Sequence, residues 1–211
     1  RLTMDLYSFD KHREQLDHFL SYKEDGVFYV GHASILARIN SKLFLFDPVC
    51  QRPPYLNSWL FFPSQVMDPR LLNVDAVFVS HCHQDHFDTE FLKKLKPSIP
   101  IYIVGGRPEF NKMFDAAGLK VTSIPPEKIV DIGDGVEAYG ALHEYNSIDS
   151  SVVLRNKKFS VYHGNDNFVT AKTLAPMKEA VGNVDVGCIP FAFIHWYPFL
   201  LDNVDPKWKE A

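Results

Sequence analysis

The chain has 211 residues, of which 46% are hydrophobic and 14% aromatic, enough to bury the core of a globular domain. Lysine and arginine total 22 against 26 acidic residues, the net charge is −4, and neither sign forms a long block, so a nucleic-acid partner is not expected. Three scattered cysteines argue against a disulfide framework, and we find neither a secretory leader nor an apolar run of about eighteen residues that could span a bilayer. We therefore expect a soluble, cytoplasmic protein.

The first predicted element is a surface helix over residues 9–23, where apolar side chains recur at near-helical spacing. Short strands follow at 27–30, 35–39 and 43–46, the last two joined as a hairpin through Asn40 and Ser41. After a proline-rich loop over 48–69, strands are expected at 74–80, 99–104, 119–124, 136–142, 151–155, 158–163 and 184–189, and helices at 88–96, 107–117 and 170–181. We expect one α/β domain over residues 1–211, with packed sheets inside and helices outside.

The most informative segment is His81-Cys82-His83-Gln84-Asp85-His86, which directly follows an apolar strand. Imidazole and carboxylate groups are the ligands that suit zinc, iron and manganese, and so short a run cannot wrap all four groups around one ion. His81 and His83 can point the same way from an extended segment, while Asp85 and His86 fall beyond the turn. The spacing therefore predicts two adjacent metal ions. A polar loop of solvated histidines is the alternative, but the strand before the segment and a helix capped by Asp88 after it favour a rigid site.

The order of these signals resembles the metallo-β-lactamase superfamily, whose signature H-x-H-x-D-H is matched by residues 81–86. The resemblance implies an αββα four-layer sandwich of two mixed sheets with helices outside. It also implies two divalent metal ions, with zinc as the first choice and iron or manganese as alternatives. By position, the resemblance assigns the first ion to His81, His83 and His143, the second to Asp85 and His86, and the bridging role to Asp166. Asp47, at the end of the run 43–46, would orient the metal loop.

The superfamily's last motif, a histidine near the carboxyl terminus that completes the second site, has no clear match. His195, next to Trp196, lies far enough along the chain but belongs by context to a loop, so we expect both residues in the pocket, with His195 as a metal ligand as the alternative. Either the closing segment is not among these residues, or the second site is completed differently. His163 is expected to be a neighbour of the site and not a ligand.

The segment Gly31-His32-Ala33-Ser34 is similar to the G-H-A-[ST] segment of the branch that includes N-acylphosphatidylethanolamine phospholipase D and ascorbate-6-phosphate lactonase. It places His32 near the site. The resemblance implies a hydrolase that uses a metal-bridging hydroxide on an ester, lactone or phosphodiester, with Asp85 orienting the hydroxide and relaying a proton. The same pattern also resembles fold relatives that hold two irons and activate dioxygen, so a biosynthetic hydroxylase is the alternative. A non-catalytic metal-binding domain is the second alternative, because the last histidine is missing.

The sequence says less about the pocket and the partners. Aromatic stretches at 59–63 and 191–201 are interpreted as core, or otherwise as the wall of an apolar pocket. Cys82 is interpreted as a spacer, with a thiolate ligand as the alternative. We expect a small-molecule substrate and leave a homo-oligomer open. Spacing cannot separate zinc from iron when all ligands are histidine and carboxylate.

Overall fold

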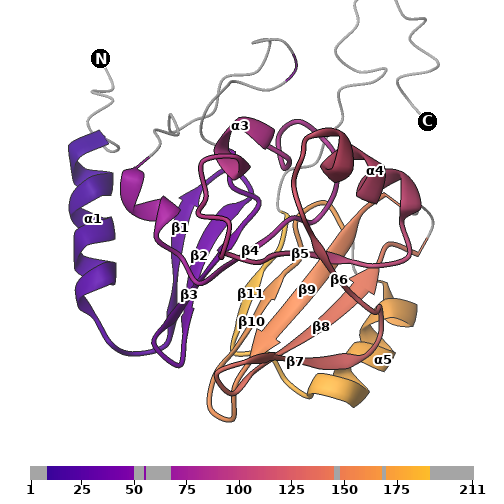
Figure 1. Cartoon of the computed structure of the whole chain (residues 1–211). Coiled ribbons are helices and arrows are strands. Elements are labelled where there is room, and N and C mark those ends of the chain that lie inside the picture. Colours follow the sequence, from indigo (N-terminus) through magenta and orange to yellow (C-terminus); the bar gives the residue numbers. More distant parts are fainter. Residues whose placement is uncertain (1–8, 50–54, 56–67, 145–147, 168–169, 191–211) are drawn as a thin grey trace, which may run out of the picture.

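The computed structural model describes residues 9–49, 55, 68–144, 148–167 and 170–190. This part of the chain forms two β-sheets packed face to face, with helices on both outer surfaces (Figure 1). The predicted αββα sandwich of the α/β class is thereby confirmed. Among the described residues, no helix is both long enough and apolar enough to cross a membrane.

The first sheet has the strand order β1-β2-β3-β4-β5-β6. Neighbouring strands are antiparallel from β1 to β3 and parallel from β3 to β6. The hairpin between β2 and β3 turns through Asn40 and Ser41, both at positive φ, as the predicted two-residue turn requires. The strands are Gly26–Gly31 (β1), Ser34–Ile39 (β2), Lys42–Phe46 (β3), Ala76–Phe78 (β4), Ile101–Val104 (β5) and Thr122–Ile124 (β6).

The second sheet has the order β11-β10-β9-β8-β7, antiparallel except for the β10–β11 pair. Its strands are Ile129–Gly133 (β7), Val136–Leu142 (β8), Ser150–Arg155 (β9), Ser160–His163 (β10) and Val186–Cys188 (β11). Strand β7 was not predicted. Its residues alternate between exposed and partly buried, and it pairs only with β8, so its apolar signal is weak.

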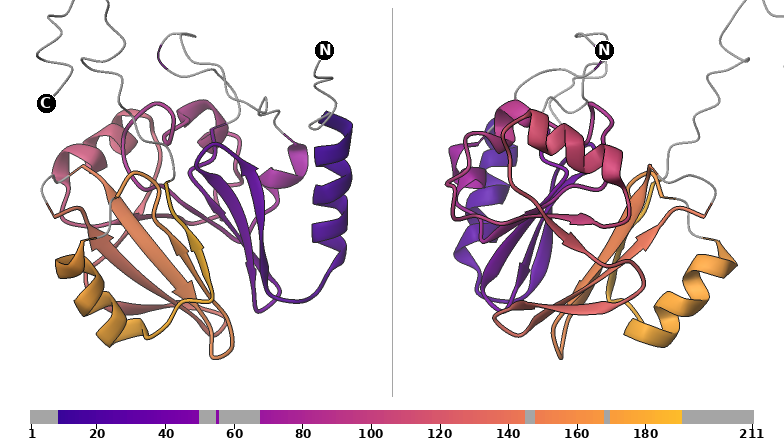
Figure 2. Two further views of the ribbon diagram at one scale, coloured as in Figure 1. Left: turned by 180° about the vertical axis from the view of Figure 1, so that it is seen from behind. Right: turned by 45° about the vertical axis from the view of Figure 1, so that its right-hand side comes forward.

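Helices cover the outer face of each sheet. Helix α5 (Ala171–Val181) packs on the second sheet, on the side opposite the helices of the first sheet (Figure 2). The elements over the first sheet are α1 (Phe9–Ser21), the short 3-10 helix η2 (Pro69–Leu72), α3 (Thr89–Leu92) and α4 (Pro108–Ala116). Asp88 caps α3 as predicted, because its carboxylate accepts a hydrogen bond from the Phe91 amide at 3.0 Å.

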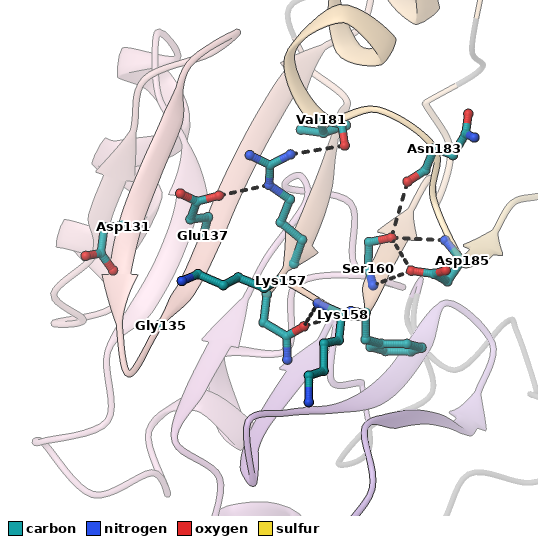
Figure 3. A pocket seen from close by; sticks show the side chains of 12 residues that line it. Asp131, Gly135, Glu137, Lys157, Lys158, Ser160, Val181, Asn183 and Asp185 are labelled. Atoms are coloured by element: carbon teal, nitrogen blue, oxygen red, sulfur yellow. Dashed lines mark hydrogen bonds and ion pairs between the residues drawn. The ribbon is translucent and has the colours of Figure 1, made fainter.

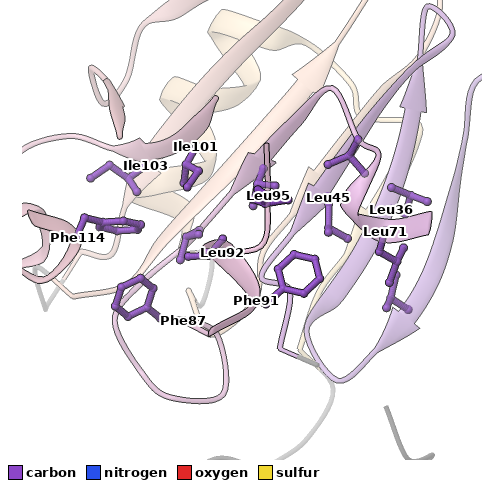
Figure 4. Packing of buried hydrophobic residues seen from close by; sticks show 14 of the residues in the cluster. Leu36, Leu45, Leu71, Phe87, Phe91, Leu92, Leu95, Ile101, Ile103 and Phe114 are labelled. Atoms are coloured by element: carbon purple, nitrogen blue, oxygen red, sulfur yellow. The ribbon is translucent and has the colours of Figure 1, made fainter. Parts of the chain in front are cut away.

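Three layers of apolar side chains fix this arrangement, and the alternation of side chains along each strand sorts residues between them. In β3, Phe44 and Phe46 face the second sheet, whereas Leu45 faces the helices. The outer layer under the helices includes Phe91 and Phe114, both fully buried (Figure 4). The third layer joins the second sheet to α5 through Tyr139, Val153 and Met177. The loops at one edge of the two sheets are therefore carried by a packed scaffold.

Candidate metal centre

The candidate metal ligands and Asp47 lie in loops that leave or enter six strands. The segment 81–86 follows β4, Asp47 follows β3, and Asp166 follows β10, so three of the loops lie at the carboxyl ends of strands. His32 lies in the turn between β1 and β2, and Asp149 directly precedes β9. Residues separated by more than a hundred positions are thus brought together where both sheets end.

Three groups of side chains place their ligand atoms within 4.8 Å of one another. Each group contains two histidines and one aspartate. The groups are His81 with His83 and Asp149, His32 with Asp85 and His86, and His81 with His86 and Asp166.

The first group is centred on His81, whose side chain is fully buried. Its Nε2 atom lies 2.8 Å from Nδ1 of His83 and 3.6 Å from Oδ1 of Asp149. Oδ2 of Asp166 is 3.8 Å from the same nitrogen and 3.5 Å from Nε2 of His86. The Asp166 carboxylate therefore lies between His81 and His86, a position in which the predicted bridging role is possible.

The second group is centred on Asp85, which is buried and accepts hydrogen bonds at both oxygens. The Tyr55 hydroxyl donates to Oδ1 at 2.8 Å, and Nε2 of His32 lies 3.0 Å from Oδ2. Nε2 of His86 is 3.5 Å from that same Oδ2. Burial raises the pKa of the Asp85 carboxyl, but the hydrogen bonds from His32 and Tyr55 and the nearby His86 outweigh it and hold this pKa well below its usual range.

Asp47 orients two of the histidines from beneath. Its Oδ1 accepts the Ser80 amide at 2.7 Å, and its Oδ2 accepts the Ser80 hydroxyl at 2.6 Å and Nδ1–H of His86 at 2.8 Å. Because the Ser80 hydroxyl donates its proton to Asp47, it accepts from Nδ1–H of His81, 2.9 Å away. Both histidines then carry their proton on Nδ1 and present the Nε2 lone pair to the centre of the cluster. The orienting role predicted for Asp47 would act through these hydrogen bonds.

The electrostatics of the cluster favour a bound cation. Burial lowers the pKa of His81 to about 4, so its imidazole is neutral and offers a lone pair at neutral pH. Burial also acts to lower the pKa of His86, but the carboxylates of Asp166 and Asp47 raise it to about 10, so the surroundings of this ring stabilise positive charge, whether a proton or a metal ion carries it. Burial acts to raise the pKa of Asp47, yet the hydrogen bond from His86 and its charge bring it to about 2.

Three residues in or next to these loops have a left-handed backbone conformation. His32, Asp47 and Asn165 adopt φ values of 49°, 41° and 43°, a region that residues other than glycine seldom occupy. Each is the neighbour of a candidate ligand or is one itself. Such conformations cost roughly 1–3 kcal/mol each and persist where the surrounding structure imposes them, as it does at functional sites.

Arg107, the residue directly before α4, ties two of these loops to the first sheet, and its role was not predicted from the sequence. The residue is 5% exposed, and its Nη1 donates to the carbonyls of Ser80 and Ile148, both at 2.6 Å. Nε and Nη2 donate to the Val104 carbonyl at 3.1 and 2.8 Å. Burial lowers the pKa of Arg107 to about 10, which still leaves it charged at neutral pH. It holds the residue before His81 next to the residue before Asp149.

The structure brings together most of the predicted site residues. His81, His83, Asp85, His86 and Asp166 all belong to the three groups, and Asp47 contacts them. His143 belongs to none of the groups formed by the described residues; its amide donates to the Asp149 carbonyl at 2.9 Å, so the two residues are neighbours in space. Ligation of a metal by His143 stays a prediction. The roles of His195 and Trp196 also stay predictions, because both residues lie outside the described part of the chain. The aromatic stretches 59–63 and 191–201 lie outside it as well.

Two neighbours of the cluster have other roles in the described structure. His163 is buried, and its Nε2 bonds to the Ala33 carbonyl at 2.8 Å, in keeping with the prediction of a neighbour. Cys82 packs partly buried against the core beneath the helices. Asp149 was missed by sequence reasoning, because nothing in its local sequence distinguishes it from an aspartate at the start of any strand.

The residues fit a divalent metal. Nε2 of His86 is buried and makes no hydrogen bond within the described chain. The lone pair of His81 Nε2 faces two carboxylate oxygens, an arrangement of acceptors that a cation stabilises. The donor set of imidazole and carboxylate suits zinc, iron or manganese.

A pocket of about 580 Å³ lies elsewhere, along the second sheet and the end of α5 (Figure 3). It is lined by polar and charged residues that include Glu137, Lys157, Ser160 and Asp185. None of the candidate metal ligands lines it.

Two mixed sheets enclosed by helices, with imidazoles and carboxylates converging at one edge, define a metal-binding α/β sandwich. Residues 42–199 match the family model described as the beta-lactamase superfamily domain, and the chain belongs to the metallo-β-lactamase superfamily.

Comparison with individual proteins gives relatives of different kinds. The chain is 30% identical over 196 residues to a Mycolicibacterium smegmatis protein named as a Rieske 2Fe-2S iron-sulfur protein, covering 86% of this chain and 37% of that protein. It is 35% identical over 104 residues to the cytidine monophosphate-N-acetylneuraminic acid hydroxylase of Xenopus laevis, covering 46% of this chain and 17% of that enzyme. The chain thus spans well under half the length of these relatives.

Solved structures share the fold at lower identity. CmlA, a diiron β-hydroxylase from Streptomyces venezuelae, superposes with a TM-score of 0.59 at 19% identity, covering 79% of this chain and 34% of that one. An isothiocyanate hydrolase from Delia radicum gut bacteria superposes with a TM-score of 0.54 at 17% identity, covering 72% of this chain and 67% of that one. Oxygenases and hydrolases therefore share this scaffold, and the fold alone does not select between them.

Proposed function

We propose that this chain is the metal-holding domain of a non-haem iron oxygenase that hydroxylates a small molecule. The observation that carries the proposal is the group His81, His83 and Asp149, two imidazoles and one carboxylate whose ligand atoms lie within 4.8 Å of one another. In this proposal Asp149 fills the role that the superfamily resemblance gives to His143. Two histidines and one carboxylate form a ligand set typical of iron enzymes that activate dioxygen. The relatives at 30% and 35% identity, an iron–sulfur protein and a hydroxylase, support the same interpretation.

The proposed hydroxylation needs dioxygen and a source of electrons. Hydroxylation of a C–H bond places one atom of dioxygen in the product and the other in water, and it consumes two electrons and two protons. We propose a Rieske-type iron–sulfur centre as the reductant, by analogy with the Mycolicibacterium smegmatis relative. The three cysteines of this chain, Cys50, Cys82 and Cys188, do not have the paired cysteine and histidine spacing of such a centre, so the electrons would come from beyond these residues.

The described side chains have defined parts in this proposal. His81, His83, Asp149, Asp85, His86 and Asp166 would hold the metal, which supplies redox chemistry and charge stabilisation when bound. Asp47 fixes the tautomers of His81 and His86, and Tyr55 fixes Asp85 through its hydroxyl. Burial of His81 and His86 keeps water away from their ring faces.

A hydrolase remains the second candidate, and the electrostatics of Asp85 favour it. A carboxylate whose pKa is held well below its usual range stays ionised, so Asp85 is available to orient a nucleophilic water and take its proton. The likeness of Gly31-His32-Ala33-Ser34 to the phospholipase D and lactonase branch suggests esters, lactones and phosphodiesters as substrates. The same residues would then hold zinc.

The test compares Fe²⁺ and Zn²⁺ binding by the wild type and by Asp149→His, which supplies three histidines to the first position. We expect the substitution to move the ratio of the two dissociation constants toward zinc by about tenfold or more, because an imidazole is a softer ligand than a carboxylate. Asp115→His, on the exposed face of α4, is the matched control.

The second arm measures reaction type. Protein loaded anaerobically with Fe²⁺ should consume dioxygen in the presence of a reduced Rieske-type ferredoxin, and His81→Ala should lose that uptake. Zinc-loaded protein should not hydrolyse a panel of esters, lactones and phosphodiesters. Hydrolysis by the zinc form together with no dioxygen uptake by the iron form would refute the oxygenase proposal and favour the hydrolase.

A further inference from the structure

The second metal position needs a ligand that the sequence motif does not provide. Asp85 and His86 are two protein ligands, and the Asp166 carboxylate, which lies between His81 and His86, is shared between the two positions. Counted with the shared Asp166, the second position has three protein ligands, one fewer than the first position with His81, His83 and Asp149. The strand histidine that completes the second position in the superfamily has no clear match in this sequence.

His32 lies where such a ligand is needed. Its Nε2 is 3.0 Å from Oδ2 of Asp85, and the nearest ligand atoms of His32, Asp85 and His86 all lie within 4.8 Å of one another. The rings of His32 and His86 meet edge to face, with centroids 5.5 Å apart. The buried Nε2 of His86, which makes no hydrogen bond among the described residues, is one of the three converging atoms. The group is therefore a built cluster and not a lone exposed histidine.

The turn that carries His32 is fixed on both sides. The Ala33 carbonyl accepts a hydrogen bond from Nε2 of His163 at 2.8 Å, which anchors the turn to the second sheet. The Ser34 hydroxyl donates to the Asp47 carbonyl, which anchors it to the strand beneath the metal loop. His32 itself is held at φ 49°, a strained value for a residue with a side chain. The scaffold thus imposes the direction of this imidazole.

We propose that His32 is a metal ligand of the second position, together with Asp85 and His86. The two positions then have the same composition, two imidazoles and one carboxylate each, with Asp166 between them. The proposal rests on metal binding at the proposed site but not on whether the metal serves oxidation or hydrolysis.

The alternative role for His32 is a hydrogen bond to Asp85, of the kind that Tyr55 makes to the other oxygen. The two roles differ in one measurable respect. A histidine that binds the metal through Nε2 keeps its proton on Nδ1, and a bound paramagnetic ion shifts the signal of that N–H strongly. A histidine that donates Nε2–H to Asp85 is not coordinated and lacks this strong shift.

The experiment loads the chain with Co²⁺ and follows binding by calorimetry and by nitrogen-labelled histidine NMR. We expect about two Co²⁺ per chain in the wild type and about one in His32→Ala, with the loss of one strongly shifted histidine N–H signal. His18→Ala, on the exposed face of α1, is the matched control and should change neither quantity.

Several results would overturn the proposal. One is a His32→Ala variant that is folded and keeps both ions and every shifted signal. Another is a wild type that binds one ion or none. A His32→Ala variant that fails to fold is replaced by His32→Gln, which keeps a hydrogen-bond donor of similar reach but is a poor metal ligand. Because dioxygen uptake and hydrolysis are not measured here, failure of the reaction proposal does not alter this result.

Discussion

Replacement of Arg107 by methionine removes a buried charged group that lies far in sequence from the candidate metal ligands. Its guanidinium nevertheless donates hydrogen bonds to the residues directly before His81 and Asp149. Methionine keeps much of the side-chain volume and the contact with Phe110, over whose ring the guanidinium lies at 4.8 Å. The variant loses four hydrogen bonds to three carbonyls. The perturbation is therefore mainly polar.

The magnitude follows from which carbonyls lose their donors. The Ser80 carbonyl keeps the hydrogen bond from the Ser150 hydroxyl at 2.6 Å, but the carbonyls of Val104 and Ile148 lose the guanidinium. Val104 is buried, and a buried acceptor that loses its partner costs about 1–3 kcal/mol, whereas Ile148 is 43% exposed and its carbonyl can be hydrated. We therefore expect a loss of roughly 1–3 kcal/mol in the free energy of unfolding. Because the loops before His81 and Asp149 are no longer held together, we also expect metal affinity to fall by roughly 10–100-fold.

Urea unfolding and metal titration of Arg107→Met test both numbers. The control is Arg155→Met, because Arg155 also donates to backbone carbonyls, those of Ala180 and Val181, but lies on the second sheet beside α5. The control should lose about 1 kcal/mol or less and keep its metal affinity. The reasoning is refuted if Arg107→Met loses less than about 1 kcal/mol, or if its metal affinity matches that of the control.

Three further predictions address the site and the core. Asp47→Asn should lower the free energy of unfolding of the metal-free protein by about 2 kcal/mol at pH 6, because the pKa of Asp47 falls from 3.8 to about 2 on folding. The difference between the two proteins should disappear as the pH falls from about 4 to about 2, and urea unfolding across this range measures it. Asp85→Asn should abolish turnover on the true substrate while the chain stays folded by circular dichroism, and near-normal activity would count against its assigned role. Phe91→Ala, in the fully buried layer under the helices, should lower the free energy of unfolding by about 3–5 kcal/mol, and a loss below 1 kcal/mol would mean that this layer is not packed as described.

The fold was predictable because its strands are strongly patterned and the ligand motif is specific. The hairpin through Asn40 and Ser41 and the cap at Asp88 were local signals that the structure confirms. Helix α3 is shorter than the predicted 88–96, since it covers only Thr89–Leu92. The apolar residues beyond it, such as Leu95, are buried without continuing the helix, so burial and not helical periodicity explains their pattern.

The parts of the site that were missed depend on contacts between distant segments. The role of Arg107 depends on the carbonyls of Ser80 and Ile148, which are 27 and 41 positions away and which no local pattern reveals. Asp149 joins His81 and His83 because the chain between β8 and β9 brings it back beside His143. The motif, in contrast, was readable because its ligands are almost adjacent in sequence.

Metal content per chain is the most direct test of the central claim that the three groups form one dinuclear iron centre. Protein purified anaerobically from cells grown without added metal should contain about two irons per chain by plasma mass spectrometry, and a variant with His83→Ala and Asp85→Asn should contain almost none. About two zinc ions and no iron would contradict the oxygenase proposal and leave the hydrolase. Less than half a metal ion per chain in the wild type, or equal metal in the variant, would contradict the account of the site itself.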